Sequence, residues 1–116
     1  RAVFNVLFNN RDDHTKNFGF LMGPDGVWKL APAYDVMYAY NPKGEWTYQH
    51  LCGINGKFDG HTRADLLALA KQFDIKKPEL ILDDVKRAVS SWRLFAKEVG
   101  VNDKLTNEVW SNLKLL

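Results

Sequence analysis

Apolar residues at helical spacing fill the second half of the chain, and this feature restricts its possible folds most. Between residues 62 and 116 they recur every three or four positions in three stripes: Leu66, Leu67, Leu69, Ala70 and Phe73; then Ile81, Val85, Ala88, Val89, Trp92, Phe95, Ala96 and Val99; then Leu105, Val109 and Leu113. A half-buried strand would instead show strict alternation. We therefore expect three helices in this half of the chain.

Residues that start and stop helices separate the three stripes. Thr62 followed by Asp65 resembles a capping box, in which two polar side chains satisfy the free N–H groups at a helix start. Pro78 suits the first turn of the second helix, which is expected to continue to Gly100. Asn102 is a good N-cap for the third helix.

The first half of the chain has a different pattern. Residues 1–10 read as the end of a helix, in which Arg1 lies in mid-helix, so we expect the chain to be a fragment. The runs "FGFLM" and "VWKL" flank a "GPDG" turn and predict a β-hairpin, and residues 36–61 are expected to be irregular. The predicted fold is a single domain over residues 1–116, mostly α with one small β-hairpin.

Composition limits the function classes without choosing one. The net charge of +2 is too small to argue for nucleic-acid or membrane binding, and no apolar segment approaches the ~20 residues that cross a bilayer. Cys52 is the one cysteine, so an internal disulfide cannot form. A reducing, soluble, cytoplasmic location is expected.

Short polar side chains gather in "NNRDDHTKN", between the first helix and the hairpin. Phosphoryl transfer needs a carboxylate for the attacking hydroxyl and hard oxygen ligands for Mg²⁺. Arg11-Asp12 is followed after four residues by Asn17, which matches the kinase pattern R-D-x-x-x-x-N, and Asp35 comes after the hairpin. If Asn17 opens the first strand and Asp35 follows the second, the antiparallel turn brings both oxygens to one site.

The segment "DDHTKNFGFLMGPDGVWKLAPAYDV" resembles the catalytic segment of the HipA family, bacterial serine/threonine kinases that are toxins of type II toxin–antitoxin modules. The later "LCGINGKFDGHTRADLLALAKQF" resembles the stretch that follows it in this family. The resemblance covers roughly residues 1 to 75. It implies the C-terminal lobe of a protein-kinase-like fold.

The resemblance also implies roles for individual residues. Asp12 would be the catalytic base, and Asn17 and Asp35 would bind the Mg²⁺ that accompanies ATP. Lys16 would approach the transferred phosphate, as part of both the catalytic and the ATP-binding groups. His14 matches the catalytic-loop histidine and is expected to hold the loop by hydrogen bonding.

Two positions depart from ordinary protein kinases. Asn10 replaces the usual histidine before Arg11, and Asp35-Val36-Met37 replaces Asp-Phe-Gly. The chain also has no candidate for the phosphate-covering loop or the strand lysine of an N-terminal lobe. We therefore expect the chain alone to be inactive.

The resemblance implies partners as well. The expected substrate is a protein, with an aminoacyl-tRNA synthetase as a plausible target, and the expected partner is a helix-turn-helix antitoxin. DNA contact would be weak or indirect, through Lys76-Lys77 and Lys86-Arg87. Two alternatives stay open: a lipid or small-molecule kinase, and a non-catalytic pseudokinase that serves as an interaction module.

Simpler interpretations apply to other residues. Asp13 is expected to be a solvated loop residue. His50, Cys52 and His61 could form a zinc set with His14, but their spacing matches no standard structural zinc site. The four tryptophans are expected to anchor the core: Trp28, Trp46, Trp92 and Trp110.

Overall fold

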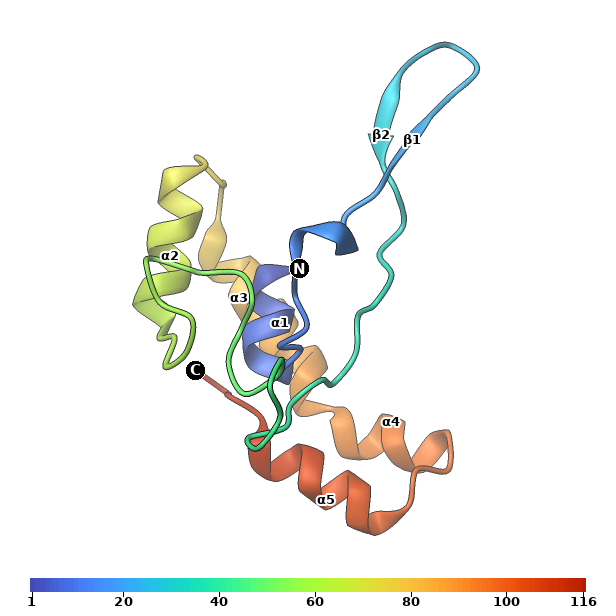
Figure 1. Cartoon of the computed structure of the whole chain (residues 1–116), viewed down its shortest axis with the longest axis vertical. Coiled ribbons are helices and arrows are strands. Elements are labelled where there is room, and N and C mark those ends of the chain that lie inside the picture. Colours follow the sequence, from blue (N-terminus) through green and yellow to red (C-terminus); the bar gives the residue numbers. More distant parts are fainter.

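Helices make up most of the regular structure, as the sequence predicted. The computed structural model describes residues 1–116 and has five α-helices and one two-stranded sheet (Figure 1). The helices are α1 (Ala2–Phe8), α2 (Arg63–Gln72), α3 (Pro78–Ser90), α4 (Trp92–Glu98) and α5 (Asp103–Asn112). A 3₁₀ turn, η1 (Thr15–Asn17), precedes strands β1 (Phe20–Met22) and β2 (Trp28–Leu30). None of the helices combines the length and hydropathy needed to span a bilayer.

The predicted helix starts are confirmed. The Thr62 side chain accepts the Asp65 N–H, and the Asp65 carboxylate accepts the Thr62 N–H at 2.8 Å, which completes a capping box for α2. Hydrogen bonds from Asn55, Lys57 and Thr62 hold the pKa of Asp65 well below its usual range. Pro78 lies in the first turn of α3. The Asn102 side chain accepts the Leu105 N–H at the start of α5.

The single helix expected between Pro78 and Gly100 is wrong, because Ser91 divides it into α3 and α4. Ser91 Oγ donates to the Arg87 carbonyl oxygen at 3.2 Å, and the Ser91 N–H bonds back three residues to Ala88. Serine side chains that bond to the preceding turn bend helices, and helix breaks occur at serine pairs such as Ser90-Ser91. Residues 62–116 therefore contain four helices and not three.

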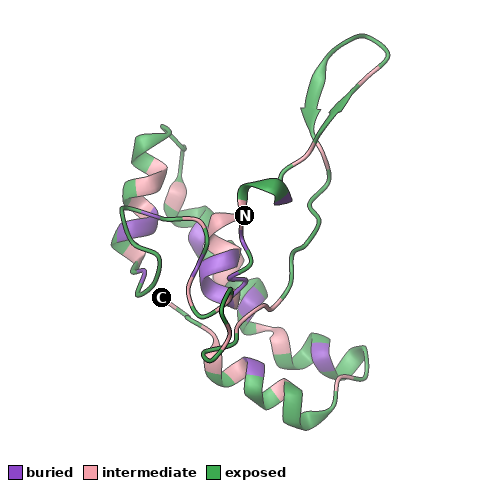
Figure 2. Cartoon of the chain, viewed as in Figure 1, coloured by how far each residue is buried: buried purple, intermediate pink, exposed green.

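The core lies where α1 and α2 pack against α3. Four buried side chains form it: Val6, Ile54, Leu66 and Leu82. A second apolar contact joins the other end of α1 to α4, where the Phe8 and Trp92 rings lie 5.4 Å apart. Figure 2 shows buried residues on α1, and others lie in the loop that follows it, so this part of the chain is well enclosed. The packing of α1 therefore holds the start of the following loop in place.

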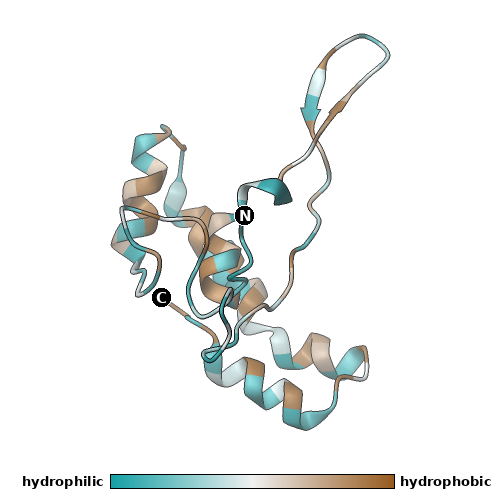
Figure 3. Cartoon of the chain, viewed as in Figure 1, coloured by the Kyte–Doolittle hydropathy of each residue, from teal (hydrophilic) through white to brown (hydrophobic).

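The hairpin extends away from the helices into solvent (Figure 1). Its strands are antiparallel and pair Phe20 with Leu30, and Met22 with Trp28. All six strand residues are exposed, although Figure 3 shows β1 to be apolar. Trp28 is 65% exposed and Trp46 71%, so the expectation that they anchor the core is wrong. Trp92 is half-buried and donates from Nε1 to the Thr106 carbonyl between α4 and α5.

Residues 36–61 contain no helix or strand, only isolated bridges. This irregular segment nevertheless packs closely on the rest. It supplies Ile54 to the core and buries His50 and His61. Its first part pairs with the end of α1 through a parallel bridge between Asn10 and Ala39. The segment thus lies beside the loop that carries the predicted catalytic residues.

Candidate active site

The polar loop begins where Asn9 ends α1. Asn9 adopts the left-handed conformation (φ 52°), which stops the helix, and is fully buried. Its side-chain Nδ2 donates to the Asn112 carbonyl at the end of α5, and its Oδ1 accepts from Arg11 Nε at 2.9 Å. Asparagine tolerates the left-handed region better than most residues. The direction in which the loop leaves α1 is therefore fixed by the contacts of Asn9 with the end of α5 and with Arg11.

Arg11 points into the protein and is 2% exposed. Its guanidinium donates to the Tyr48 carbonyl and forms an ion pair with Asp59 at 3.1 Å. It also lies over the Tyr40 ring, 4.2 Å from the ring centroid. Burial alone would raise the pKa of Asp59, but the Gly60 N–H and the charge of Arg11 hold it below its usual value. Arg11 thus ties the loop to three points of residues 36–61.

Asp13 is buried, so the expectation of a solvated loop residue is wrong. Its Oδ2 lies 2.8 Å from His50 Nδ1, and its Oδ1 accepts the N–H groups of Leu51 at 2.7 Å and Cys52 at 3.0 Å. Burial alone would raise the pKa of Asp13, but the His50 and backbone hydrogen bonds outweigh it and hold this pKa below the usual value. Because the carboxylate is ionised and only accepts, His50 Nδ1 must carry the proton.

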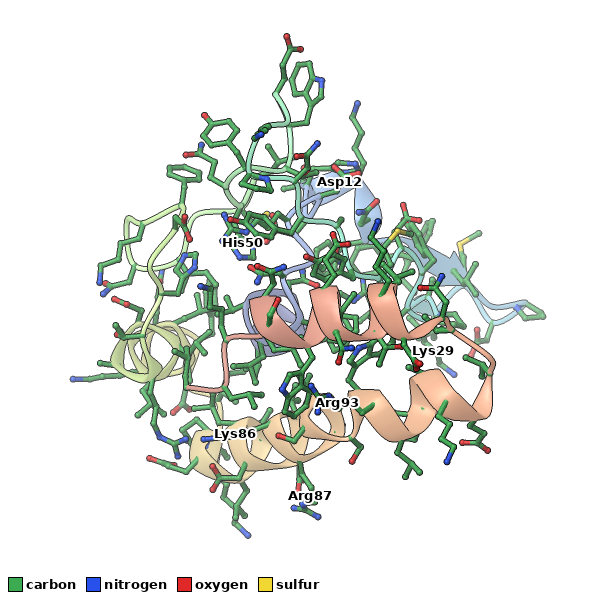
Figure 4. All side chains as sticks on the ribbon, turned by 90° about the horizontal axis from the view of Figure 1, so that it is seen from below. Asp12, Lys29, His50, Lys86, Arg87 and Arg93 are labelled. Carbon is green, nitrogen blue, oxygen red and sulfur yellow. The ribbon has the colours of Figure 1, made fainter.

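Asp12 lies between these two inward-pointing residues and faces the other way. Its side chain is 51% exposed. Alternate residues of an extended segment point to opposite sides, so fixing Arg11 and Asp13 inside directs Asp12 outward. Figure 4 shows Asp12 and His50 at the same end of the molecule. The carboxylate is therefore held at the surface by neighbours that are themselves immobilised.

His14 does not hold the loop as expected. Its Nε2 lies 3.7 Å from Asp12 Oδ1, which is too long for a hydrogen bond, and its buried Nδ1 has no hydrogen-bond partner. The loop is held instead by Asp13 and Arg11. No feature of the sequence identified Asp13 as the anchor, because its partners His50, Leu51 and Cys52 lie 37 to 39 residues further along the chain.

Asn17 is buried at the end of η1 and does not open β1. Its Nδ2 donates to the Asp12 carbonyl oxygen at 2.8 Å, and its own carbonyl oxygen accepts from Arg1 at 2.6 Å. Its Oδ1 makes no hydrogen bond within the chain. The side-chain oxygen of Asn17 is therefore available to a ligand, and its amide group lies close to the backbone of Asp12.

Asp35 follows β2 and has an exposed side chain that makes no hydrogen bond or ion pair. Two contacts place its backbone beside the loop. Asn10 Nδ2 donates to the Asp35 carbonyl oxygen at 2.8 Å, and the Tyr34 hydroxyl donates to the Lys16 carbonyl oxygen at 2.8 Å. The hairpin thus returns the backbone of Tyr34 and Asp35 to the loop that contains Asp12.

Lys16 itself is exposed, and its ammonium group has no partner in the chain. Of the other basic residues named from the sequence, three are engaged elsewhere. Lys76 pairs with Asp74, Lys86 donates to the Leu116 carbonyl oxygen, and Arg87 pairs with Asp84. Figure 4 shows Lys86 and Arg87 at the end of the molecule opposite Asp12.

The histidines of the possible zinc set, His50 and His61, have other contacts. His50 pairs with Asp13, and His61 Nε2 lies 2.9 Å from the Lys57 carbonyl oxygen. Cys52 is half-buried, and burial together with Asp13 raises the pKa of its thiol. No group of three or more histidine, cysteine, aspartate or glutamate side chains is arranged to hold a metal ion. If Asn17 and Asp35 bind a metal ion, ligand oxygens such as phosphates would have to complete its coordination shell.

Comparison with known proteins agrees with the resemblance found in the sequence. The model of the HipA-like C-terminal domain matches residues 1–92, which include the polar loop, the hairpin, Asp35, α2 and α3. Neither the curated proteins nor the solved structures compared with the chain gave a match. The chain therefore belongs to the HipA-like C-terminal domain family.

Proposed function

We propose that this chain is the catalytic-lobe segment of a HipA-like serine/threonine kinase, which transfers the γ-phosphate of ATP to a protein hydroxyl. The observation that supports this most is the arrangement around Asp12. Arg11 and Asp13 are buried and bonded to the irregular segment, whereas the carboxylate between them is exposed. A loop built only for stability has no need to hold one carboxylate in solvent between two buried charges.

Asp12 would act as the base. An exposed carboxylate can accept the proton of an incoming serine or threonine hydroxyl, and its fixed backbone removes the need to order it during the reaction. The Asn17 amide supports this placement, because Nδ2 donates to the Asp12 carbonyl oxygen and closes the loop on itself. Lys16, exposed and unpaired, would contact a phosphate oxygen.

Asn17 and Asp35 fit a Mg²⁺ site. The Asn17 Nδ2 is already used, so its Oδ1 is the atom left for a ligand, and the Asp35 carboxylate has no partner in the chain. Amide and carboxylate oxygens are ligands that Mg²⁺ prefers. When bound, Mg²⁺ would neutralise charge on the nucleotide phosphates. The contribution of this chain would be to supply those two side-chain oxygens.

The isolated chain should not transfer phosphate. It contains no Gly-rich loop to cover the phosphates and no strand lysine paired with a helix glutamate. We propose that a nucleotide-binding lobe completes the enzyme. Family membership also makes a helix-turn-helix antitoxin the partner we propose, and an aminoacyl-tRNA synthetase a protein substrate to test.

The test uses the full-length protein with labelled ATP and Mg²⁺, and it offers protein acceptors and inositol-lipid acceptors in parallel. Label on protein that falls by about 10²–10⁴-fold in Asp12→Asn supports the proposal. Asp83→Asn is the matched control, because Asp83 is an exposed carboxylate on α3 that pairs only with Arg63. Label on lipid alone would contradict a protein kinase, and no Mg²⁺-dependent nucleotide binding would indicate a pseudokinase.

A further inference from the structure

Asn10 is a buried polar residue that the proposed chemistry does not use. It is 3% exposed, and its side-chain Nδ2 makes two hydrogen bonds: one to Asn5 Oδ1 at 3.1 Å and one to the Asp35 carbonyl oxygen at 2.8 Å. Its Oδ1 is buried with no partner. An unsatisfied buried oxygen lowers stability, and the two hydrogen bonds of Nδ2 are what Asn10 gains in return.

The orientation of the Asn10 amide is fixed by its partners. Nδ2 meets the Asp35 carbonyl oxygen, which can only accept, so the nitrogen must lie on that side. Asn5 is itself buried on α1, the helix at the centre of the core. Asn10 therefore connects the backbone of Asp35, in an otherwise irregular stretch, to the most fixed helix of the molecule.

Asp35 depends on such a connection. Its φ is 50°, in the left-handed region that residues other than glycine rarely adopt. Its side chain has no contact partner that would orient it, so the direction of the carboxylate follows from the backbone alone. Backbone conformations of this kind persist only where the surroundings impose them, and they gather at functional sites.

We propose that Asn10 is a positioning residue for Asp35: it holds the Asp35 carbonyl oxygen, and through it the left-handed turn from which the Asp35 carboxylate projects. This inference rests on the proposed function, in which both residues bind Mg²⁺. Asn10 acts on the metal only through Asp35. It also explains why the chain keeps a buried amide with one unsatisfied oxygen.

The expected consequence is selective. Removing groups that orient metal ligands typically weakens metal affinity 10–100-fold. Asn10→Leu keeps the approximate shape of the side chain and removes both donors, so the Asp35 turn should relax while the core remains. Asn17, whose own contacts with Asp12 and Arg1 do not involve Asn10, should keep its place.

The experiment uses the full-length protein and follows the backbone amide signals of residues 1–116 by NMR while Mn²⁺ with ATP is added in place of Mg²⁺. In the wild type, signals near Asn17 and near Asp35 should broaden at the same low Mn²⁺ concentration. In Asn10→Leu, the affinity of the shared site should fall, so broadening near Asp35 and near Asn17 should need about tenfold more Mn²⁺. The Cα shift of Asp35 should also lose its left-handed value.

Controls separate the outcomes. Val89→Ala removes buried volume from α3, and should leave the Mn²⁺ response unchanged. Asn10→Ser, which is too short to reach the Asp35 carbonyl oxygen, serves as the second variant if Asn10→Leu does not fold. An unchanged response near Asp35 in a folded Asn10 variant overturns the positioning role and leaves the proposed function intact. A wild type with no shared response at Asn17 and Asp35 overturns both.

Discussion

Asp13 and His50, 37 residues apart in the chain, form a pair closed off from solvent, with His50 Nδ1 2.8 Å from Asp13 Oδ2 and neither side chain more than 3% exposed. The pair joins the polar loop to the irregular segment. Two further hydrogen bonds, from the N–H groups of Leu51 and Cys52, reach the same carboxylate. Asp13 is thus the residue on which the shape of the loop depends most.

Asp13→Ala should destabilise the chain by about 3–5 kcal/mol, because it leaves His50 buried without its partner and two N–H groups without an acceptor. Urea unfolding followed by circular dichroism measures this loss. Asp12→Asn is the adjacent control and should change the free energy of unfolding by no more than about 0.5 kcal/mol, since the Asp12 side chain is half-exposed and makes no hydrogen bond, only a contact with His14 at 3.7 Å. Equal losses of unfolding free energy in the two variants would contradict an inward-pointing Asp13 beside an outward-pointing Asp12.

Stability should fall in acid in a way that depends on Asp13. Its pKa is lowered on folding, so the unfolded chain takes up a proton first, at about pH 3.9. The contribution of Asp13 is therefore complete above that pH and is lost as the pH falls through the lower, folded pKa. Urea midpoints between pH 2 and 7 should decline less steeply in acid for Asp13→Asn than for the wild type. Parallel curves would refute this assignment.

Arg11→Lys should cost about 2–3 kcal/mol despite keeping the charge. A lysine ammonium cannot donate at once to Asn9, the Tyr48 carbonyl oxygen and Asp59, nor stack on Tyr40 as the planar guanidinium does. Thermal unfolding measures the loss. Arg63→Lys provides the comparison, because Arg63 forms a partly exposed pair with Asp83, and this change should be nearly neutral.

Trp28→Lys on the hairpin should leave the free energy of unfolding within about 0.5 kcal/mol of wild type, since Trp28 is 65% exposed. It should also reduce self-association, because apolar edge strands pair with other chains and lysine opposes this. Light scattering over a range of concentrations tests the second effect. Trp92→Ala should instead cost about 3 kcal/mol, because Trp92 packs against Phe8 and bonds to Thr106.

Local signals in the sequence predicted local structure well. The caps at Thr62 and Asn102, the first-turn Pro78 and the hairpin around "GPDG" all act within a few residues, and the structure has each of them. The break at Ser91 was missed because the apolar stripe continues across it. A hydroxyl bonded to the Arg87 carbonyl leaves no mark in the hydropathy pattern.

The burial of polar residues could not be predicted from the sequence. Arg11, Asp13 and His50 are buried because groups 37 to 48 positions apart meet, and no periodicity records such pairs. The reverse error concerns Trp28 and Trp46, whose size suggested core positions, although both lie on parts of the chain that face solvent. For the site, the sequence named Asp12, Asn17 and Asp35 as candidates, but the buried contacts of the loop around Asp12 could not be predicted from it.

Residues that stabilise the fold alternate here with a residue proposed to act in catalysis: Arg11 and Asp13 point inward, and Asp12 between them points outward. A substitution at the middle position would silence phosphate transfer by the proposed enzyme and leave its shape, and hence its binding surfaces, unchanged. A substitution on either side would instead destabilise the fold. Inert relatives that still recognise the same partners are therefore one mutation away, and they should arise at Asp12 far more readily than at the residues beside it.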